Sequence, residues 1–219
     1  MTSKIEIRKP DPALTFRSKL TPLKNIDMII LHHMAHKTAD IQAVHNYHRT
    51  RTYTNSSGKT GYWSGIGYNY FITFDGTIYE ARGLHEGAHT YGYNNHSIGI
   101  GFQGDFQQQP MPDAQLAAGS ALCSKLLQDH SLTEKDIKLH KDLAVTSCPG
   151  KNFRFTQLKQ ILATAQVMNP DPAPAPDPVA NPDSNTIYTV QVGAFKVKDN
   201  AEKLKQQLIR QGYKDTFIK

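Results

Sequence analysis

The chain contains one almost unbroken apolar run that ends in two histidines, Ile26-Asp27-Met28-Ile29-Ile30-Leu31-His32-His33. A run of this length without polar alternation is typical of a strand that is buried on both faces, as in α/β proteins. Side chains alternate along a strand, so His32 and His33 should point to opposite faces. Both faces are apolar upstream, so periodicity leaves open which histidine faces a ligand.

The segments on either side of this strand complete an α/β pattern. Two β-prone runs joined by Asp75-Gly76 predict a hairpin, because Asp-Gly is a strong turn signal. Helical spacing of apolar residues predicts a helix that starts at Thr38 and another from Asp113 to about His130. Residues 1–25 should form a polar N-terminal arm. A strand is expected at 97–102, where the glycines allow close approach of backbone or ligand. Further along, we expect a cap-like turn at 133–136, a strand at 137–140 and a helix around 155–165.

Three features of these segments bear on function. His45 and His48 are either the polar tips of a buried helical stripe, the interpretation we favour, or metal ligands. The Thr/Ser/Gly-rich residues 51–64, with Trp63 near their end, form a loop that could border a binding cleft. The Gly-rich, aromatic residues 83–95 are either a carbohydrate- or peptide-contacting edge or a plain surface loop.

The composition favours an anionic partner, because Lys+Arg number 25 against 19 Asp+Glu. No dense basic run interleaved with aromatic residues is present, so a dedicated nucleic-acid groove is not expected. No apolar run approaches the length of a membrane span. The N-terminus lacks the apolar region of a signal peptide, so we expect synthesis in the cytoplasm and another route of exit for any action outside.

A change in composition divides the chain after residue 168. Residues 169–186 form a Pro/Ala/Asp linker, which is stiff and extended. We therefore expect a large domain at 1–168 and a small βαβ unit at 187–219, with a strand at 187–192, a helix capped by Asp199 and a closing strand at 217–218. So short a unit cannot bury a stable core alone, so it should dock on something, such as a second copy.

A second stretch carries chemistry: His140 and Cys148 lie eight positions apart in a loop that closes on Pro149-Gly150. Such a loop can fold back so that imidazole and thiolate meet, and one of the two upstream histidines would complete a His/His/Cys zinc site with an open position. Cys148 could instead be a small buried hydrophobe. It could also be a nucleophile paired with His140, although no helix N-terminus is evident to lower its pKa. The other cysteine, Cys123, lies in an apolar helical pattern and should be core.

Four motifs together resemble the zinc-dependent N-acetylmuramoyl-L-alanine amidases, which are related to phage lysozyme-type amidases and to peptidoglycan recognition proteins. The motifs are Ile30-Leu31-His32-His33, Ile66-Gly67-Tyr68-Asn69-Tyr70-Phe71-Ile72, Ser97-Ile98-Gly99-Ile100, and His140 followed by Thr146-Ser147-Cys148-Pro149-Gly150. They occur in the family's order over residues ~25–165. The resemblance implies a central mixed β-sheet flanked by helices.

The resemblance also implies roles for five residues. His32, His140 and Cys148 would bind one Zn²⁺ per catalytic domain, and Tyr68 would face the zinc-bound water. Thr146 takes a position where some relatives carry lysine and recognition proteins carry threonine. The implied reaction is hydrolysis of the amide between N-acetylmuramic acid and L-alanine. The alternative is a non-catalytic peptidoglycan-binding protein, but members that only recognise peptidoglycan generally lack the cysteine.

The C-terminal unit resembles one half of a SPOR-like repeat, on the residues Tyr188-Thr189-Val190-Gln191-Val192-Gly193-Ala194-Phe195, Asn200-Ala201-Glu202 and Gly212-Tyr213. Such repeats bind peptidoglycan and usually occur in tandem, so a single one should either pair between chains or bind the wall weakly. The implied partner is peptidoglycan, both glycan strand and stem peptide, without nucleic acid or membrane insertion. The protein would be an endolysin released through a phage pore, or an autolysin freed by lysis or non-classical export.

Overall fold

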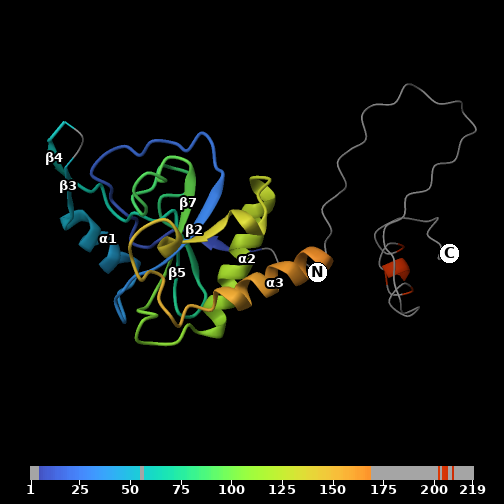
Figure 1. Ribbon diagram of the computed structural model, residues 1–219. Coiled ribbons are helices and arrows are strands. Elements are labelled where there is room, and N and C mark those ends of the chain that lie inside the picture. Colours follow the sequence, from blue (N-terminus) through green and yellow to red (C-terminus); the bar gives the residue numbers. More distant parts are fainter. Residues whose placement is uncertain (1–4, 55–56, 169–201, 203, 207–208, 210–219) are drawn as a thin grey trace, which may run out of the picture. The chain divides into compact units, whose positions relative to one another are not determined.

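The computed structural model describes residues 5–54 and 57–168, together with positions 202, 204–206 and 209 (Figure 1). The chain divides into two compact units, Met1–Asp171 and Pro172–Lys219. The predicted linker at 169–186 and the strands predicted at 187–192 and 217–218 lie outside the described residues. Among the residues that are described, no helix combines the length and apolarity that a membrane span requires.

The first unit is built on a six-stranded sheet with the order β1-β6-β5-β7-β2-β8. The β5–β6 pair is antiparallel and the other neighbours are parallel, so the sheet is mixed, as the family resemblance implies. The strands are β1 (Ile7–Arg8), β2 (Met28–His33), β5 (Tyr70–Ile72), β6 (Ile78–Glu80), β7 (Ser97–Phe102) and β8 (Ile137–Leu139). Strands β7 and β2, which pair with each other, are buried along almost their whole length.

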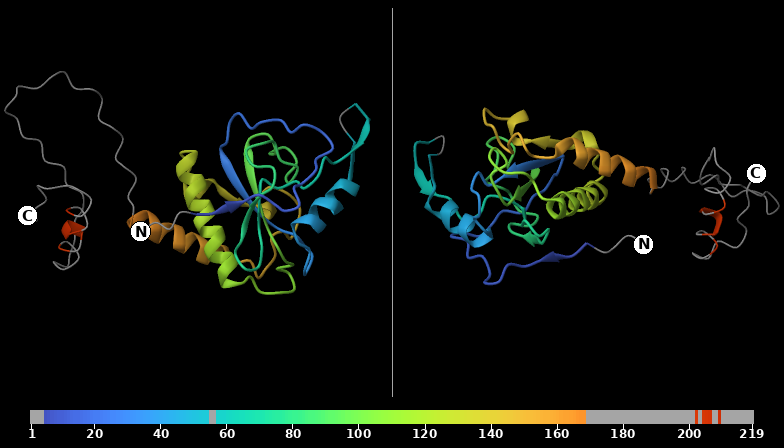
Figure 2. Two further views of the ribbon diagram at one scale, coloured as in Figure 1. Left: turned by 180° about the vertical axis from the view of Figure 1, so that it is seen from behind. Right: turned by 90° about the horizontal axis from the view of Figure 1, so that it is seen from below.

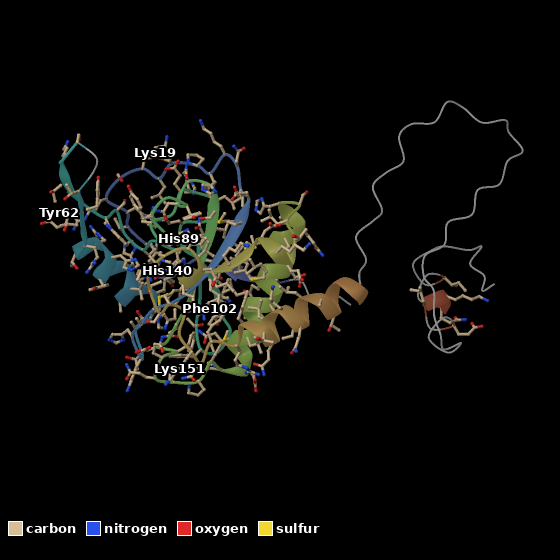
Figure 3. All side chains as sticks on the ribbon, in the orientation of Figure 1. Lys19, Tyr62, His89, Phe102, His140 and Lys151 are labelled. Atoms are coloured by element: carbon tan, nitrogen blue, oxygen red, sulfur yellow. The ribbon has the colours of Figure 1, made fainter. Side chains whose placement is uncertain are left out.

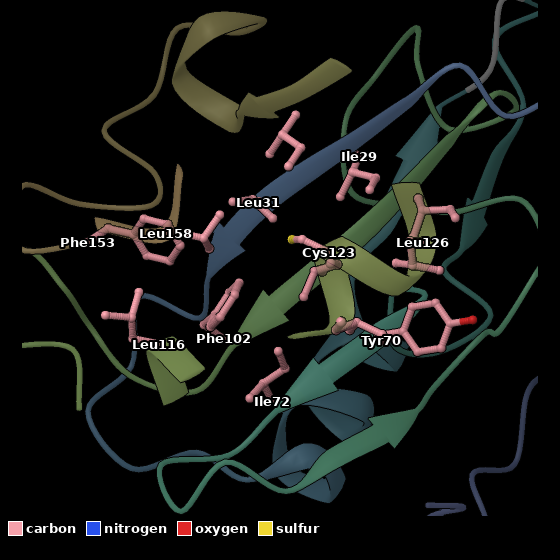
Figure 4. Packing of buried hydrophobic residues seen from close by; sticks show 14 of the residues in the cluster. Ile29, Leu31, Tyr70, Ile72, Phe102, Leu116, Cys123, Leu126, Phe153 and Leu158 are labelled. Atoms are coloured by element: carbon pink, nitrogen blue, oxygen red, sulfur yellow. The ribbon is translucent and has the colours of Figure 1, made fainter. Parts of the chain in front are cut away.

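Helices cover both faces of this sheet (Figure 2). Helices α2 (Asp113–Asp129) and α3 (Phe155–Met168) bury one face, where Leu31, Phe102 and Cys123 belong to one apolar cluster (Figure 4). Helix α1 (Ile41–Thr50) packs its Ile41 and Val44 on the other face. Full burial of Cys123 confirms its assignment to the core.

Two short 3-10 turns connect the sheet to the loops. The first, η1 (Glu134–Asp136), follows Thr133, and the Thr133 and Asp136 side chains cap it reciprocally, as the cap-like sequence predicts. The second, η2 (His140–Asp142), begins where β8 ends, and Asp142 accepts a hydrogen bond from the Leu139 amide at 2.8 Å. His140 therefore lies just beyond a buried strand, on a turn with a fixed start.

Three sequence-based expectations are wrong. Helix α1 starts at Ile41 and not at Thr38, because Asp40 provides the cap by accepting from the Ala43 amide at 2.8 Å. The predicted loop at 51–64 contains an antiparallel hairpin, β3 (Thr52–Thr54) with β4 (Thr60–Tyr62). The N-terminal arm includes strand β1, which pairs in parallel with β6.

Candidate metal centre

The floor of the site is the face of β2 and β7 that points away from α2 and α3. The register places Ile30 beside Gly99 and His32 beside Gly101. A Cβ atom on Gly99 would lie 2.4 Å from Cδ2 of His89, and one on Gly101 would lie 2.8 Å from Cδ2 of Tyr68. The sequence predicted that backbone or a ligand comes close to these glycines, but side chains do so: the ring of His89 at Gly99, and the ring of Tyr68 with the Met34 methyl group at Gly101.

Three side chains with metal-binding atoms meet at the end of β2. The ligand atoms of His32, His140 and Cys148 all lie within 4.8 Å of one another, and within the described residues no other group of three or more has this geometry. His32 Nδ1 lies 3.8 Å from Cys148 Sγ, and the two imidazole centroids are 4.5 Å apart. Ligand atoms around a tetrahedral zinc are about 3.4–3.6 Å apart at usual bond lengths, so the set fits zinc after a small inward movement.

Backbone contacts of the loop bring Cys148 to this point. The Lys141 amide donates to the Cys148 carbonyl at 2.9 Å, which closes the loop between the two ligands. The Cys148 amide donates to Thr146 Oγ1 at 3.2 Å, and the His33 amide donates to Cys148 Sγ at 3.4 Å. The sequence-based prediction that this loop folds back on itself is therefore confirmed.

His33 points to the other face of β2 and has a structural role. Its Nδ1 accepts from the Phe106 amide at 3.1 Å, and it lies 3.7 Å from a carboxylate oxygen of Asp105. Through these contacts the side chain of His33 anchors the loop that follows β7. Of the two histidines, the structure therefore brings His32, and not His33, to His140 and Cys148.

Burial keeps the three ligands uncharged in the absence of metal. Burial lowers the pKa of His32 well below its usual value, and neighbouring histidines lower it further. Burial also lowers the pKa of His140. It raises the pKa of the Cys148 thiol to about 12, against a smaller opposing effect of the His33 amide. Two neutral imidazoles and a thiol therefore face one another in the site.

His89, which the sequence did not single out, orients His32. His32 Nε2 lies 3.1 Å from His89 Nδ1, and the Thr90 hydroxyl lies 3.1 Å from His89 Nδ1 and 3.4 Å from His32 Nε2. Burial lowers the pKa of His89 to about 3, so its ring is neutral and Nδ1 can accept the Nε2 proton of His32. That tautomer leaves the lone pair of His32 Nδ1 pointing towards Cys148. Figure 3 shows His89 and His140 close to the centre of the first unit.

The two residues predicted to act in catalysis lie beside the ligands. The ring of Tyr68 is 5.2 Å from that of His32, and burial, followed by the nearby Cys148, raises its pKa. Thr146 is exposed, and its hydroxyl oxygen accepts from the Cys148 amide. Its own proton is therefore free to donate. Catalytic roles for both residues stay predictions.

The two histidines of α1 do not join the metal cluster. His45 Nδ1 accepts from the Ile66 amide at 3.2 Å, and its Nε2 faces the Thr15 carbonyl at 3.1 Å. His48 Nδ1 accepts from the Gly67 amide at 3.0 Å. Both histidines are thus the polar tips of an inward-facing helical stripe.

Comparisons with known proteins agree with this geometry. Residues 22–151 match the family described as N-acetylmuramoyl-L-alanine amidase, and residues 184–219 match the SPOR domain. Two similar solved structures are endolysin and amidase chains from Clostridium intestinale, named LysCS and LysC. LysCS is 30% identical in sequence to this chain, and the two superpose with a TM-score of 0.63. The match includes 74% of this chain and 99% of the LysCS chain. LysC is 33% identical in sequence, with a TM-score of 0.59, and the match includes 68% of this chain and 93% of the LysC chain.

A curated relative is peptidoglycan-recognition protein SC2 of Drosophila melanogaster, which is 37% identical over 93 residues. The match includes 42% of this chain and 50% of the relative, so the chain spans half the length of that protein.

Proposed function

The chain belongs to the N-acetylmuramoyl-L-alanine amidase family, whose match covers more than half of its residues, and from this premise we propose that it hydrolyses the amide between N-acetylmuramic acid and L-alanine in peptidoglycan. The observation that carries the proposal is the meeting of His32, His140 and Cys148 at the end of β2. Two imidazoles and a thiolate leave one position of a tetrahedral zinc open, as catalytic zinc sites require. The amidase and SPOR matches together imply a peptidoglycan partner.

Zinc held by these residues would supply a Lewis acid that polarises the scissile carbonyl and acidifies a bound water. The protein's own part is to hold the ligands and place proton donors around the reacting atoms. His32 is fixed by His89, and Cys148 by the His33 amide. These two ligands are thus presented in one orientation before metal binds.

Tyr68 acts as a proton donor. Burial raises its pKa and keeps the phenol protonated at neutral pH, so it can orient the attacking water and give its proton to the leaving amine; the proton that the water loses restores the phenol. Thr146 contributes a hydroxyl that donates to the oxyanion of the tetrahedral intermediate. A well-placed donor of this kind is worth about 3 kcal/mol.

The test is a digest of purified peptidoglycan, with and without a chelator, in which new amino groups and new reducing ends are both measured. We expect new N-terminal L-alanine without reducing ends, loss of activity on chelation and recovery with zinc. The Cys148→Ser variant should lose both zinc and activity. Amino groups from another residue would identify a peptidase. Wall binding without any product would identify a non-catalytic peptidoglycan-binding protein.

The place of action follows from the substrate. We propose an endolysin or autolysin role, in which the chain reaches the wall after lysis, through a phage pore or by non-classical export. The SPOR match suits either role, because it would add wall affinity outside the first unit. Appearance of activity in the medium only when cells lyse would support release by lysis, and early activity around intact cells would contradict it.

A further inference from the structure

Two histidines of helix α1 hold one stretch of backbone from the same side. His45 Nδ1 accepts a hydrogen bond from the Ile66 amide at 3.2 Å, and His48 Nδ1 accepts one from the Gly67 amide at 3.0 Å. These amides belong to consecutive residues, and the next residue in the chain is Tyr68, the proton donor of the proposed reaction. The two imidazoles therefore fix the backbone that leads directly into Tyr68.

This backbone lies outside the sheet, so no strand ladder supplies its hydrogen bonds. Ile66 and Gly67 are buried and precede β5, which begins at Tyr70. The Ile66 carbonyl accepts from Arg82 Nε at 2.6 Å, and the Gly67 carbonyl accepts from the Ala88 amide at 2.9 Å. A buried amide that loses its partner is destabilised, so without the imidazoles this segment would move until its two amides reach water or another acceptor.

His45 has a single orientation and a single tautomer. Because its Nδ1 accepts an amide N–H, its Nε2 carries the proton and donates to the Thr15 carbonyl at 3.1 Å. The ring of Phe16 meets the imidazole edge to face at a centroid distance of 5.2 Å, and a Cβ atom on Gly65 would lie only 2.5 Å from Cε1 of His45. Burial lowers the pKa of His45 and keeps the imidazole neutral. His45 is thus a rigid support between the N-terminal arm and Ile66.

The position of the Tyr68 ring depends on this support. The ring lies against Gly101, where a Cβ atom would come within 2.8 Å of Tyr68 Cδ2, and its centroid is 5.2 Å from that of His32 and 5.6 Å from that of His48. Packing contacts of this kind allow a ring to slide in its own plane. The distance from the phenol oxygen to the reacting atoms is therefore set by the backbone of Tyr68, and a shift of about 1 Å can lower a rate about 10²-fold.

We propose that His45 and His48 are positioning residues for Tyr68, which set its reach towards the reacting atoms by holding the Ile66 and Gly67 amides. This inference rests on the proposed amidase activity and adds to it two residues that act through Tyr68 and not through the metal. Their loss should therefore lower turnover and leave zinc affinity unchanged. His45 joins this backbone to the N-terminal arm, so its substitution should have the larger effect.

The experiment measures release of N-terminal L-alanine from a soluble N-acetylmuramoyl peptide by the full chain with zinc. His45→Leu removes both hydrogen bonds, whereas His45→Gln offers an acceptor oxygen and a donor NH2 group without charge. We expect His45→Leu to lower kcat about 10–100-fold and His45→Gln to recover most of the loss. KM and zinc affinity should stay within about twofold of wild type in both variants. Leu116→Ala, a buried change in α2, controls for lost stability and should keep the wild-type kcat.

A double-mutant cycle shows whether His45 acts through Tyr68. In a Tyr68→Phe background, His45→Leu should lower the remaining kcat by less than about twofold, because the proton donor that it positions is already gone. An equal loss in both backgrounds would overturn the inference, since His45 would then act on another part of the site. A wild-type kcat in His45→Leu would overturn it as well.

His48 provides a second pair of variants in case His45→Leu does not fold. It is only half-buried, so it tolerates substitution better. His48→Asn keeps an acceptor near the place of Nδ1 for the Gly67 amide, whereas His48→Leu removes it. We expect kcat to be about tenfold lower in His48→Leu than in His48→Asn. Equal kcat values in these two variants would remove His48 from the positioning role.

Two spectroscopic measurements test the positioning without turnover. Hydrogen exchange of the Ile66 amide should be slow in wild type and His45→Gln and fast in His45→Leu, while the amides of β5 stay protected. The ring-proton shifts of Tyr68, which depend on the nearby rings of His32 and His48, should move in His45→Leu and not in His45→Gln. Unchanged exchange and shifts in His45→Leu would refute the positioning role in an enzyme that is active. If wild type releases no alanine, the proposed function fails, and these two measurements still decide whether His45 places Tyr68.

Discussion

Zinc binding should release one proton from this site, and the proton should come from Cys148. Without metal the thiol has a pKa raised by burial to about 12, and the pKa values of His32 and His140 are lowered. Neutral pH is thus about five units below the pKa of the Cys148 thiol. Ionising it costs about 7 kcal/mol, which zinc must offset. The histidines are already neutral and contribute no proton.

The ionisation of Cys148 also determines how zinc affinity depends on pH. Raising the pH lowers the cost of ionising the thiol, so zinc affinity should rise with pH. The logarithm of the association constant should increase by about one per pH unit between about pH 6 and about pH 7. Above about pH 7 the slope should steepen, because ionisation of water on the metal adds a second proton.

Competition with a chromogenic chelator over this range measures the slope, and calorimetry in two buffers with different ionisation enthalpies counts the protons. Cys148→Asp is the control, because its carboxylate is ionised throughout and can still bind zinc. Its slope should be near zero below pH 7. A wild-type slope near zero would show that the thiol is already ionised and would refute the argument from burial. A slope of two or three in this range would show charged histidines.

Three further predictions concern single substitutions. Tyr68→Phe should keep zinc and lose about 10²–10⁴-fold in turnover, measured by release of N-terminal L-alanine; an unchanged rate would remove Tyr68 from the chemistry. His89→Ala should weaken zinc binding about 10–100-fold in chelator competition, and His89→Gln should restore part of it by accepting from His32; unaltered affinity in both would contradict the orienting role. Phe102→Ala should lower the free energy of unfolding by about 3–5 kcal/mol in urea titration, because its fully buried ring packs against Phe153 at 5.0 Å; a loss below about 1 kcal/mol would show that the core refills the space.

The elements that could be predicted from the sequence are those with a long periodic pattern. Strand β2, helix α2 and the hairpin at Asp75-Gly76 all form as expected, because each buries an apolar stripe or requires a specific turn. Strand β1 has two residues, too few for any period. The hairpin β3–β4 was not predicted, because its strands have only three residues each and Thr52, Tyr53 and Thr54 are all exposed, so no buried apolar face marks the pair.

A site residue could be predicted from the sequence where it follows the end of a strand. It could not be predicted where its role depends on how distant strands pair with one another. His140 and Cys148 lie where the motif places them, at the end of β8 and in the following loop. The choice of His32 over His33 depends on which face of β7 has glycine, since only that face has room for the rings of Tyr68 and His89. His89 itself lies in a loop without periodicity, where no local pattern distinguishes it from the other histidines of the chain.

The same burial that makes Cys148 a poor nucleophile makes it a good ligand. A catalytic thiol needs a lowered pKa and a partner that stabilises the thiolate as an imidazolium. Here burial raises the thiol pKa and lowers those of both nearby imidazoles, so a charge-separated cysteine–histidine pair is disfavoured in either direction. A divalent metal ion favours the opposite state of the thiol, because its charge stabilises the thiolate while it binds the imidazoles in their neutral form. A thiol alkylator should therefore modify Cys148 slowly in the metal-free protein and still more slowly after zinc is added. Rapid, zinc-independent inactivation would restore the peptidase alternative.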